Sequence, residues 1–492
     1  MKFSKLPSKS LLNFITLLII ITTGGSLLHA QIFRSTNKDK EQGAEVAKQV
    51  EEQIGIYETP VTTAYLRAIG ERLVANLEDR EFDFQFQIAD QWEPNAFALP
   101  GGYVYFSPGL LILANSEGEI AGVMGHEISH VTERHSASQQ NRAVVPGLLS
   151  LPGAIVGNVV NEDLGSLINS PINMIGKVSL ASYSRKHESE ADEVGLRLSA
   201  KSGYDPLLLA KCLQQLTKDV EMLTDKKREF SFFDSHPMTD ERAEDINDEA
   251  KKVKWSKKSD IAKDRAELLQ KLDGLYYSEN PAQGIFRGQK FLHPDFNFTI
   301  TFPDGWKTTN TPSLVGAFME NQEAILIISG IGEAVDPEKP GKAFVERLAK
   351  EHNTRPESAE KVMVHDWPGY LVTIDDASSG QSAHIRYLWV TIGKLTYQLI
   401  GAGPDRYRQA LKESVLSLGP LTSEERNSIT GIRLRIAKAK PGETLAELSK
   451  RTKNVWPVNY TAMINDIPEN NTLADGQLIK IAREEKYVSG AK

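Results

Sequence analysis

Two histidines four residues apart place the strongest constraint on this chain. His126 and His130 bound an H-E-x-x-H pattern inside residues 116–135, and that stretch opens on a helix-capping sequence at 116–119. Positions four apart share one face of a helix, so both imidazoles can reach one metal ion, with Glu127 beside a water on it. The sequence therefore predicts a metal-binding helix with Glu127 as general base. The alternative is a pair of surface histidines.

A catalytic metal site needs a third protein ligand, and the downstream acids offer two candidates. Residues 137–161 contain no acidic side chain. The next predicted helix, near residues 184–199, carries Glu188 and Asp192 four apart and hence on one face, whereas Glu190 points elsewhere. One of the pair can bind zinc, and the other can accept the far N–H of a ligating histidine. The alternative is a solvated acidic helix face.

Composition narrows the chemistry further. The chain has 492 residues, a formal net charge of -8 and one cysteine, Cys212. A single thiol excludes both an intrachain disulfide and a multi-thiolate zinc site, which leaves His, Asp and Glu as the expected ligands. The mild acidity argues against a nucleic-acid partner, because such a surface needs a basic patch.

The N-terminus has the pattern of a secretory signal peptide. Three lysines precede an apolar run over residues 11–28, and a small residue at Ala30 marks the expected cleavage. We expect residues 1–30 to be removed and the mature chain to be periplasmic or secreted. The alternative is an uncleaved membrane anchor, which exports the same residues.

Four ordered motifs make the region from roughly residue 40 to 250 similar to a known family. They are residues 95–102, residues 126–131, Glu188 with Asp192, and the His236-Pro237 pair followed by Arg242. The chain resembles the zinc peptidases grouped with HtpX, the CAAX prenyl protease and the BepA-type periplasmic proteases. The resemblance implies one Zn²⁺ per chain. Its ligands are then His126, His130 and Glu188, and Asp192 supports a ligating histidine.

The same resemblance implies an exported zinc metalloendopeptidase that acts in protein quality control. Its substrates are then unfolded or misassembled envelope proteins, and contact with a membrane is compatible with this role but not required by it. A cell-wall-bound chaperone or scaffold with a latent zinc site is the alternative. A peptidoglycan hydrolase directed by the C-terminal module is a third reading.

The resemblance also gives the loop residue His236 a place near the metal. It can cover zinc as a fourth ligand and hold the enzyme latent, or it can stabilise the tetrahedral oxyanion. The remaining alternative is a helix-start histidine without metal contact. Arg242 either binds the same developing oxyanion or pairs with Asp192 or Asp240.

Residues 95–105 predict two short strands around a Pro-Gly-Gly turn. Zincins hold an extended substrate against an edge strand above the metal, through backbone hydrogen bonds. We expect substrate to pair either with residues 96–99 or with residues 103–106. The alternative is plain core sheet. The candidate substrate strand comprises Asn95, Ala96, Phe97 and Ala98.

The chain as a whole is predicted to be an α+β multidomain protein. Residues 31–278 are the expected catalytic domain, which is mostly helical and of zincin type, and residues 283–421 are an α+β domain of unknown role. The domain at residues 283–421 resembles PsbP- or Mog-like domains, on the basis of residues 302–306. The uncharged segment 143–161 predicts a buried or mobile hairpin near the cleft, and the alternative is a loop that touches a membrane or captures substrate. Further predicted helices are 43–56, 61–77, 342–352 and 406–418, and predicted strands are 82–88, 296–302, 324–328, 369–374, 384–391 and 395–401.

The last predicted domain, residues 431–484, has the order strand, helix, helix, strand. Residues 439–448, 463–465 and 473–481 resemble a LysM module, with Pro-Gly and Asp-Gly turns beside the strands. The resemblance implies binding to peptidoglycan, and the alternative is a fold used only for protein contacts. We expect this module to be small and self-contained.

Overall fold

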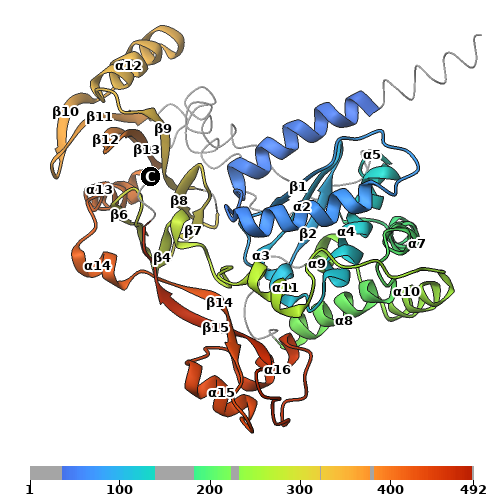
Figure 1. The fold of residues 1–492 in the computed structure, drawn as a ribbon. Coiled ribbons are helices and arrows are strands. Elements are labelled where there is room, and N and C mark those ends of the chain that lie inside the picture. The colour runs from blue at the N-terminus through green and yellow to red at the C-terminus, as the bar shows by residue number, and fades with distance from the viewer. Residues whose placement is uncertain (1–35, 139–181, 223–231, 322, 377–381, 490–492) are drawn as a thin grey trace, which may run out of the picture.

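The fold has three parts, which Figure 1 shows in blue to green, yellow to orange, and red along the chain. The predicted signal peptide and the predicted hairpin at 143–161 lie outside the residues that the structure describes. None of the described helices is long and apolar enough to cross a membrane. The structure is a computed structural model, and it describes residues 36–138, 182–222, 232–321, 323–376 and 382–489.

The catalytic domain places one long helix against a small sheet. The sheet has the order β1 (Gln85–Ile88), β3 (Tyr103–Phe106), β2 (Ala96–Leu99), so β3 is central. Alternate strand residues face α4 (Glu117–Thr132) on one side and a helix over residues 36–53 on the other. The other helices are α2 (Pro60–Val74), α3 (Pro108–Leu113), α5 (His135–Ser138), α7 (Arg185–Lys201), α8 (Leu207–Met222), α9 (Phe232–Ser235), α10 (Asp240–Lys252) and α11 (Arg265–Leu272).

Two glycines allow α4 and α7 to approach until their backbones touch. A Cβ on Gly195 would lie 2.8 Å from the backbone nitrogen of His126, and a Cβ on Gly125 would lie 3.0 Å from the carbonyl oxygen of Gly195. A larger residue at either place would push the helices apart. The crossing point is therefore fixed next to His126, and it brings the acidic first turns of α7 opposite the histidine face of α4.

The helix that carries the H-E-x-x-H pattern is shorter than the predicted span of 116–135. α4 ends at Thr132, and Arg134 adopts the left-handed conformation with φ of 57°, which stops a helix. α5 then begins at His135 in a new direction. The break allows His135 to turn back toward His130.

The middle domain is one antiparallel sheet covered on both faces. Its seven strands have the order β10-β11-β12-β13-β9-β8-β7. α12 (Glu338–His352) packs on one face, and α13 (Arg408–Leu416) with the small sheet β4-β5-β6 packs on the other. The strands are β4 (Ile285–Arg287), β5 (Lys290–His293), β6 (Phe298–Thr301), β7 (Lys307–Asn310), β8 (Leu314–Phe318), β9 (Ile325–Glu333), β10 (Ser358–Val364), β11 (Trp367–Asp376), β12 (Ala383–Ile392) and β13 (Leu395–Pro404).

Five of these strands, β4, β5, β7, β8 and β10, were not predicted from the sequence. β4 and β5 are only three and four residues long, and β7 reads Lys-Thr-Thr-Asn. No residue of the edge strand β10 is fully buried. Short or polar strands lack the apolar alternation that identifies a strand in sequence.

The C-terminal module has the predicted order of elements. β14 (Thr430–Lys438) pairs antiparallel with β15 (Leu478–Lys486), and α15 (Leu445–Thr452) and α16 (Val458–Ile464) lie between them in the chain. A short helix, α14 (Ser423–Ser428), precedes β14. The expectation that the module is self-contained is wrong, because part of its apolar surface joins the core of the catalytic domain. The joining residues are Leu434, Trp456, Tyr460, Ile464 and Ala482.

Candidate metal centre

α4 holds two imidazoles on its buried face. His126 and His130 lie one turn apart, and their Nε2 atoms are 3.0 Å from each other. Each residue is only 1% exposed. The hydroxyl of Ser116 accepts a hydrogen bond from the Glu119 backbone at 3.3 Å, which caps the start of the helix. The capping sequence thus starts the helix where it places both rings inside the domain.

α7 brings a carboxylate to the same point. One oxygen of Glu188 lies 3.4 Å from His130 Nε2, and the other lies 3.7 Å from His126 Nε2. Burial by itself would raise the pKa of Glu188, but His236 and His130 beside it lower that pKa well below its ordinary value. Glu188 is therefore ionised, which is the form that binds a metal.

His236 reaches the cluster from the loop between α9 and α10. Its Nδ1 lies 3.3 Å from His126 Nε2 and 3.2 Å from the nearer Glu188 oxygen. The ring stacks on Phe232 with centroids 4.4 Å apart, and it is fully buried. The alternative of a histidine remote from the ligand cluster does not fit this position.

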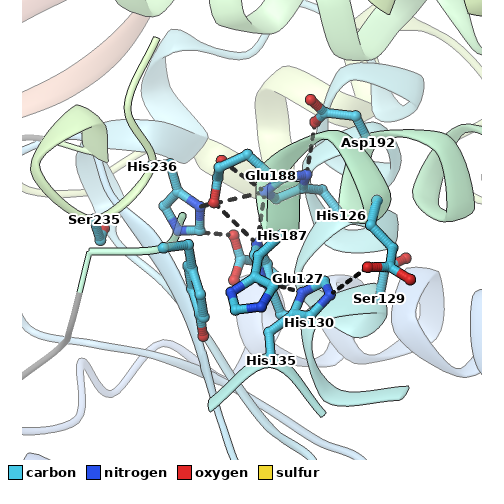
Figure 2. A network of polar contacts seen from close by, with 12 residues as sticks. His126, Glu127, Ser129, His130, His135, His187, Glu188, Asp192, Ser235 and His236 are labelled. Carbon is cyan, nitrogen blue, oxygen red and sulfur yellow. Dashed lines mark hydrogen bonds and ion pairs between the residues drawn. The ribbon is translucent and has the colours of Figure 1, made fainter. Parts of the chain in front are cut away.

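The geometry and the donor atoms fit a zinc ion. One ligand atom from each of His126, His130, Glu188 and His236 lies within 4.8 Å of the others, and Figure 2 shows the four groups turned toward one another. At 3.0 Å the two Nε2 atoms need either a proton or a metal ion between them. Tetrahedral zinc with Zn–N bonds of about 2.0–2.1 Å holds such nitrogens about 3.3 Å apart. Nitrogen and carboxylate oxygen are also its usual donors.

Asp192 and Arg242 contact the candidate ligands from outside the cluster. Asp192 Oδ1 lies 2.9 Å from His126 Nδ1, which leaves the Nε2 lone pair directed at the cluster. Arg242 donates to both Asp192 oxygens at 2.8 and 2.9 Å, and its guanidinium lies 2.6 Å from Glu188. Burial opposes ionisation of Asp192, but His126 and Arg242 lower its pKa. Of the contacts that the sequence predicted for Arg242, the structure shows the ion pair with Asp192.

Comparison with known proteins places this site in a family. The profile of peptidase family M48 matches residues 60–250, which include all four candidate ligands. Residues 60–250 match this family, and we call them the M48 domain. M48 metallopeptidases use zinc, so the resemblance stated from the motifs is confirmed for the family and for the cofactor.

The curated proteins that resemble the M48 domain carry protease names. A beta-barrel assembly-enhancing protease of Yersinia pestis is 29% identical over 223 residues, which is 45% of each chain. Metalloprotease LoiP of Escherichia coli is 29% identical over 37% of this chain and 68% of LoiP. Metalloprotease YcaL of the same organism is 34% identical over 31% of this chain and 57% of YcaL. The chain spans about half the length of the first of these relatives.

The middle domain has no comparable support. A solution structure of cyanobacterial PsbP from Synechocystis covers 28% of this chain and 95% of that chain, at 12% identity and a TM-score of 0.22. That score is too low to carry an argument about the fold. The PsbP-like reading therefore stays a prediction, as does the LysM-like reading of the C-terminal module.

Glu127 lies beside the ligands of the M48 domain. Its Oε1 is 3.4 Å from His236 Nε2, and neither carboxylate oxygen has a hydrogen-bond partner among the described residues. Burial raises the pKa of Glu127. A carboxylate without a fixed partner is free to accept a proton from a water placed against the ligands, as a general base must.

Two supports of His130 in the M48 domain were missed from the sequence. His135 Nδ1 lies 2.9 Å from His130 Nδ1, and burial lowers the pKa of His135 to about 4. Tyr183 stacks on the His130 ring with centroids 3.8 Å apart, and its hydroxyl is 3.1 Å from that of Ser136. The position of His135 directly after the motif was a signal for the first contact. Nothing in the local pattern marks Tyr183.

The sheet of the M48 domain decides between the two predicted substrate strands. β3 is hydrogen-bonded on both edges, so pairing of substrate with residues 103–106 is wrong. β2 is an edge strand of that sheet. Its candidate residues are at most 4% exposed, as the alternative of plain core sheet would have them, so pairing of substrate with residues 96–99 stays a prediction. These residues are Asn95, Ala96, Phe97 and Ala98.

Proposed function

We propose that the chain is an exported zinc-dependent endopeptidase that cleaves unfolded or misassembled envelope proteins. One observation carries the proposal: two α4 imidazoles, an α7 carboxylate and His236 converge on one buried point, with Glu127 3.4 Å from the His236 ring. The names of the relatives, all proteases, support the reaction class. The basic and apolar N-terminal pattern supports export.

The proposed roles follow from position. His126, His130 and Glu188 would hold the zinc ion, which would lower the pKa of the attacking water and polarise the scissile carbonyl. Glu127 accepts the proton of that water and returns it to the leaving amine. Asp192 keeps His126 in the tautomer whose Nε2 bears a lone pair.

The described conformation is closed to substrate. The ligands and Glu127 are each at most 1% exposed, and His236 lies against both Glu127 and Glu188. A peptide backbone needs the space that the His236 ring fills. We therefore infer that His236 is a fourth ligand of a latent state, and that cleavage requires its loop to move away.

The mechanism is tested with Glu127→Gln, which removes the base and keeps the side-chain volume. We expect cleavage of an unfolded protein such as casein to fall at least about 100-fold, with an unchanged zinc content. Glu193→Gln is the matched control, because Glu193 lies on α7 with its side chain 49% exposed and pairs with the exposed Arg197. Cleavage by Glu127→Gln at the wild-type rate would reject the assignment of the base.

A second candidate function is a chaperone or scaffold with a permanently latent zinc site. The burial of His236 among the ligands favours it. His236→Ala distinguishes the two, because it opens a coordination position without removing His126, His130 or Glu188. A peptidase gains activity in this variant. A scaffold stays inactive in casein cleavage and still suppresses aggregation of an unfolded client.

Attachment to peptidoglycan belongs to the same proposal. It is supported by the strand-helix-helix-strand order of the C-terminal module and by the exposure of both turn segments, 440–442 and 474–476. The test is sedimentation of the full chain with purified sacculi, with soluble N-acetylglucosamine oligomers as competitor. Failure to sediment would leave the module with protein contacts only. Cleavage of the sacculi would favour a peptidoglycan hydrolase instead.

A further inference from the structure

The C-terminal module holds a lysine inside the interface with the M48 domain. Lys480 lies on β15, and its side chain is fully buried. Burial lowers its pKa to about 7. Burying an amino group is costly unless its hydrogen bonds are made, so the contacts of Lys480 indicate why it is there.

The amino group of Lys480 donates to three acceptors, which lie on one short segment of the M48 domain. The Nζ atom donates to the carbonyl oxygens of Ile112 at 2.7 Å, Leu113 at 3.3 Å and Ala114 at 3.1 Å. These carbonyls are at the C-terminal end of α3, where a helix has no backbone donors left for them. Lys480 therefore supplies the donors that close the end of α3.

That end leads directly into the metal-binding helix. We call residues 112–116 the α3–α4 connection, and its last residue, Ser116, is the N-cap of α4. The amide of Asn115 donates to the Glu119 carboxylate at 2.6 Å, which ties the connection to the first turn of α4. A second contact from the module reaches the same place, since the Asn115 side chain donates to the Ile464 carbonyl at 3.2 Å.

α4 transmits a change at this connection to the ligands. A helix is stiff, and ten residues separate Ser116 from His126, or about 15 Å of helix. The helix also rests on α7 at the Gly125–Gly195 contact, immediately beside His126. A tilt of the start of α4 about this contact reorients both imidazoles against Glu188.

We propose that Lys480 is a positioning residue for the zinc ligands: the C-terminal module fixes the α3–α4 connection and thereby the orientation of His126 and His130. The module is then a structural part of the metal site. A mechanical force on the module, or a ligand bound to it, changes the affinity for zinc. The inference concerns metal affinity, so it stands or falls independently of the proposed peptidase reaction.

The test compares two variants of the full chain that weaken the same interface. Lys480→Met keeps most of the side-chain volume and removes all three hydrogen bonds to the connection. Tyr460→Phe is the matched control, because the hydrogen bonds of its hydroxyl among the described residues go to Asp219 on α8 and to Tyr277, at 2.6 Å each, and not to the connection. Lys450→Met, on the exposed face of α15, controls for loss of a lysine.

The readouts are zinc affinity by chelator competition and hydrogen exchange of the amides at 112–120. For Lys480→Met we expect zinc affinity to fall about threefold to tenfold, less than the 10–100-fold typical of a direct partner of a ligand, and exchange at 112–120 to accelerate. Tyr460→Phe and Lys450→Met should leave both readouts unchanged.

Unchanged zinc affinity in Lys480→Met, or an equal loss in Tyr460→Phe, would show that Lys480 only stabilises the interface and would overturn the proposal. If Lys480→Met does not fold, Asn115→Ala serves in its place. It removes the contact with Ile464 and leaves the lysine intact. A smaller loss of zinc affinity in the same direction is then expected, and no loss contradicts the proposal.

Discussion

Replacing Gly195 by alanine tests whether the crossing of α4 and α7 sets the metal site. The new Cβ would lie 2.8 Å from the His126 nitrogen and 2.9 Å from the Gly125 carbonyl carbon, and neither backbone atom can rotate away. Ordinary contact starts at 3.4 Å, so the helices must separate by about 0.6 Å. The separation acts on the ligands, because Gly195 lies two turns after Glu188 on α7.

The expected loss of stability is modest and the expected loss of zinc affinity is large. Overpacking costs about 1–3 kcal/mol, and the higher helix propensity of alanine offsets about 1 kcal/mol of that. The free energy of unfolding should therefore fall by at most about 2 kcal/mol. Ligand groups must be held within about 0.5 Å, so zinc affinity should fall about tenfold or more.

The assay is chelator competition for zinc together with urea unfolding, on Gly195→Ala and on Gly118→Ala as control. Gly118 lies on α4, the partner helix of α7, and its new Cβ meets only the side chain of Leu208. The control should keep wild-type zinc affinity. Wild-type affinity in Gly195→Ala, at a measurable loss of stability, would refute the reasoning that this contact sets the ligand geometry.

Four further outcomes follow from buried contacts. Asp192→Asn weakens the charge beside His126 Nδ1, and chelator competition should show a loss of zinc affinity of about 10–100-fold. Glu117→Gln removes the acceptor charge for the hydroxyls of Tyr65 and Tyr204 at 2.9 and 2.8 Å, and urea unfolding should show a loss of about 3 kcal/mol. Burial raises the pKa of Asp90 to about 6. The free energy of unfolding therefore falls as the pH rises from about 4 to 6 and the side chain ionises. Asp90→Asn should raise the melting temperature at pH 7.5 but not at pH 4. Removal of zinc with a chelator should lower the melting temperature of the wild-type protein. The loss is equivalent to about 4 kcal/mol of stability if zinc was present at 1,000 times its Kd. An unchanged melting temperature would contradict a metal site.

The metal-binding helix could be read from sequence because its signal is local. A helix places residues four apart on one face, so the spacing of His126 and His130 predicts their convergence without knowledge of the rest of the fold. The third candidate ligand was harder to predict from sequence. Glu188 lies 58 residues after His130, and only a contact between two helices brings these two residues together. The pair Glu188 and Asp192 still narrowed the choice, because one face of one helix carries both.

Contacts that depend on packing between domains could not be predicted. Lys480 stands in an apolar strand, and sequence alone gives no reason to expect acceptors for it 366 residues earlier, at Ala114. Tyr183 is similar, because its stacking on His130 depends on where the chain enters α7. The packing of Trp456 and Tyr460 in the core of the catalytic domain was equally unpredictable, since periodicity shows that a face is buried but not against what.

The charges at the centre of the M48 domain account for why so polar a cluster can be buried at all. Three carboxylates, Glu127, Glu188 and Asp192, face one guanidinium, Arg242, and all four are at most 7% exposed. With neutral imidazoles this leaves two negative charges in a region where a single unpaired charge is strongly unfavourable. A divalent cation among the ligands balances both. A metal held by these ligands would therefore stabilise the closed arrangement around His236, and it would also favour the ionised form of Glu127, whose pKa burial raises.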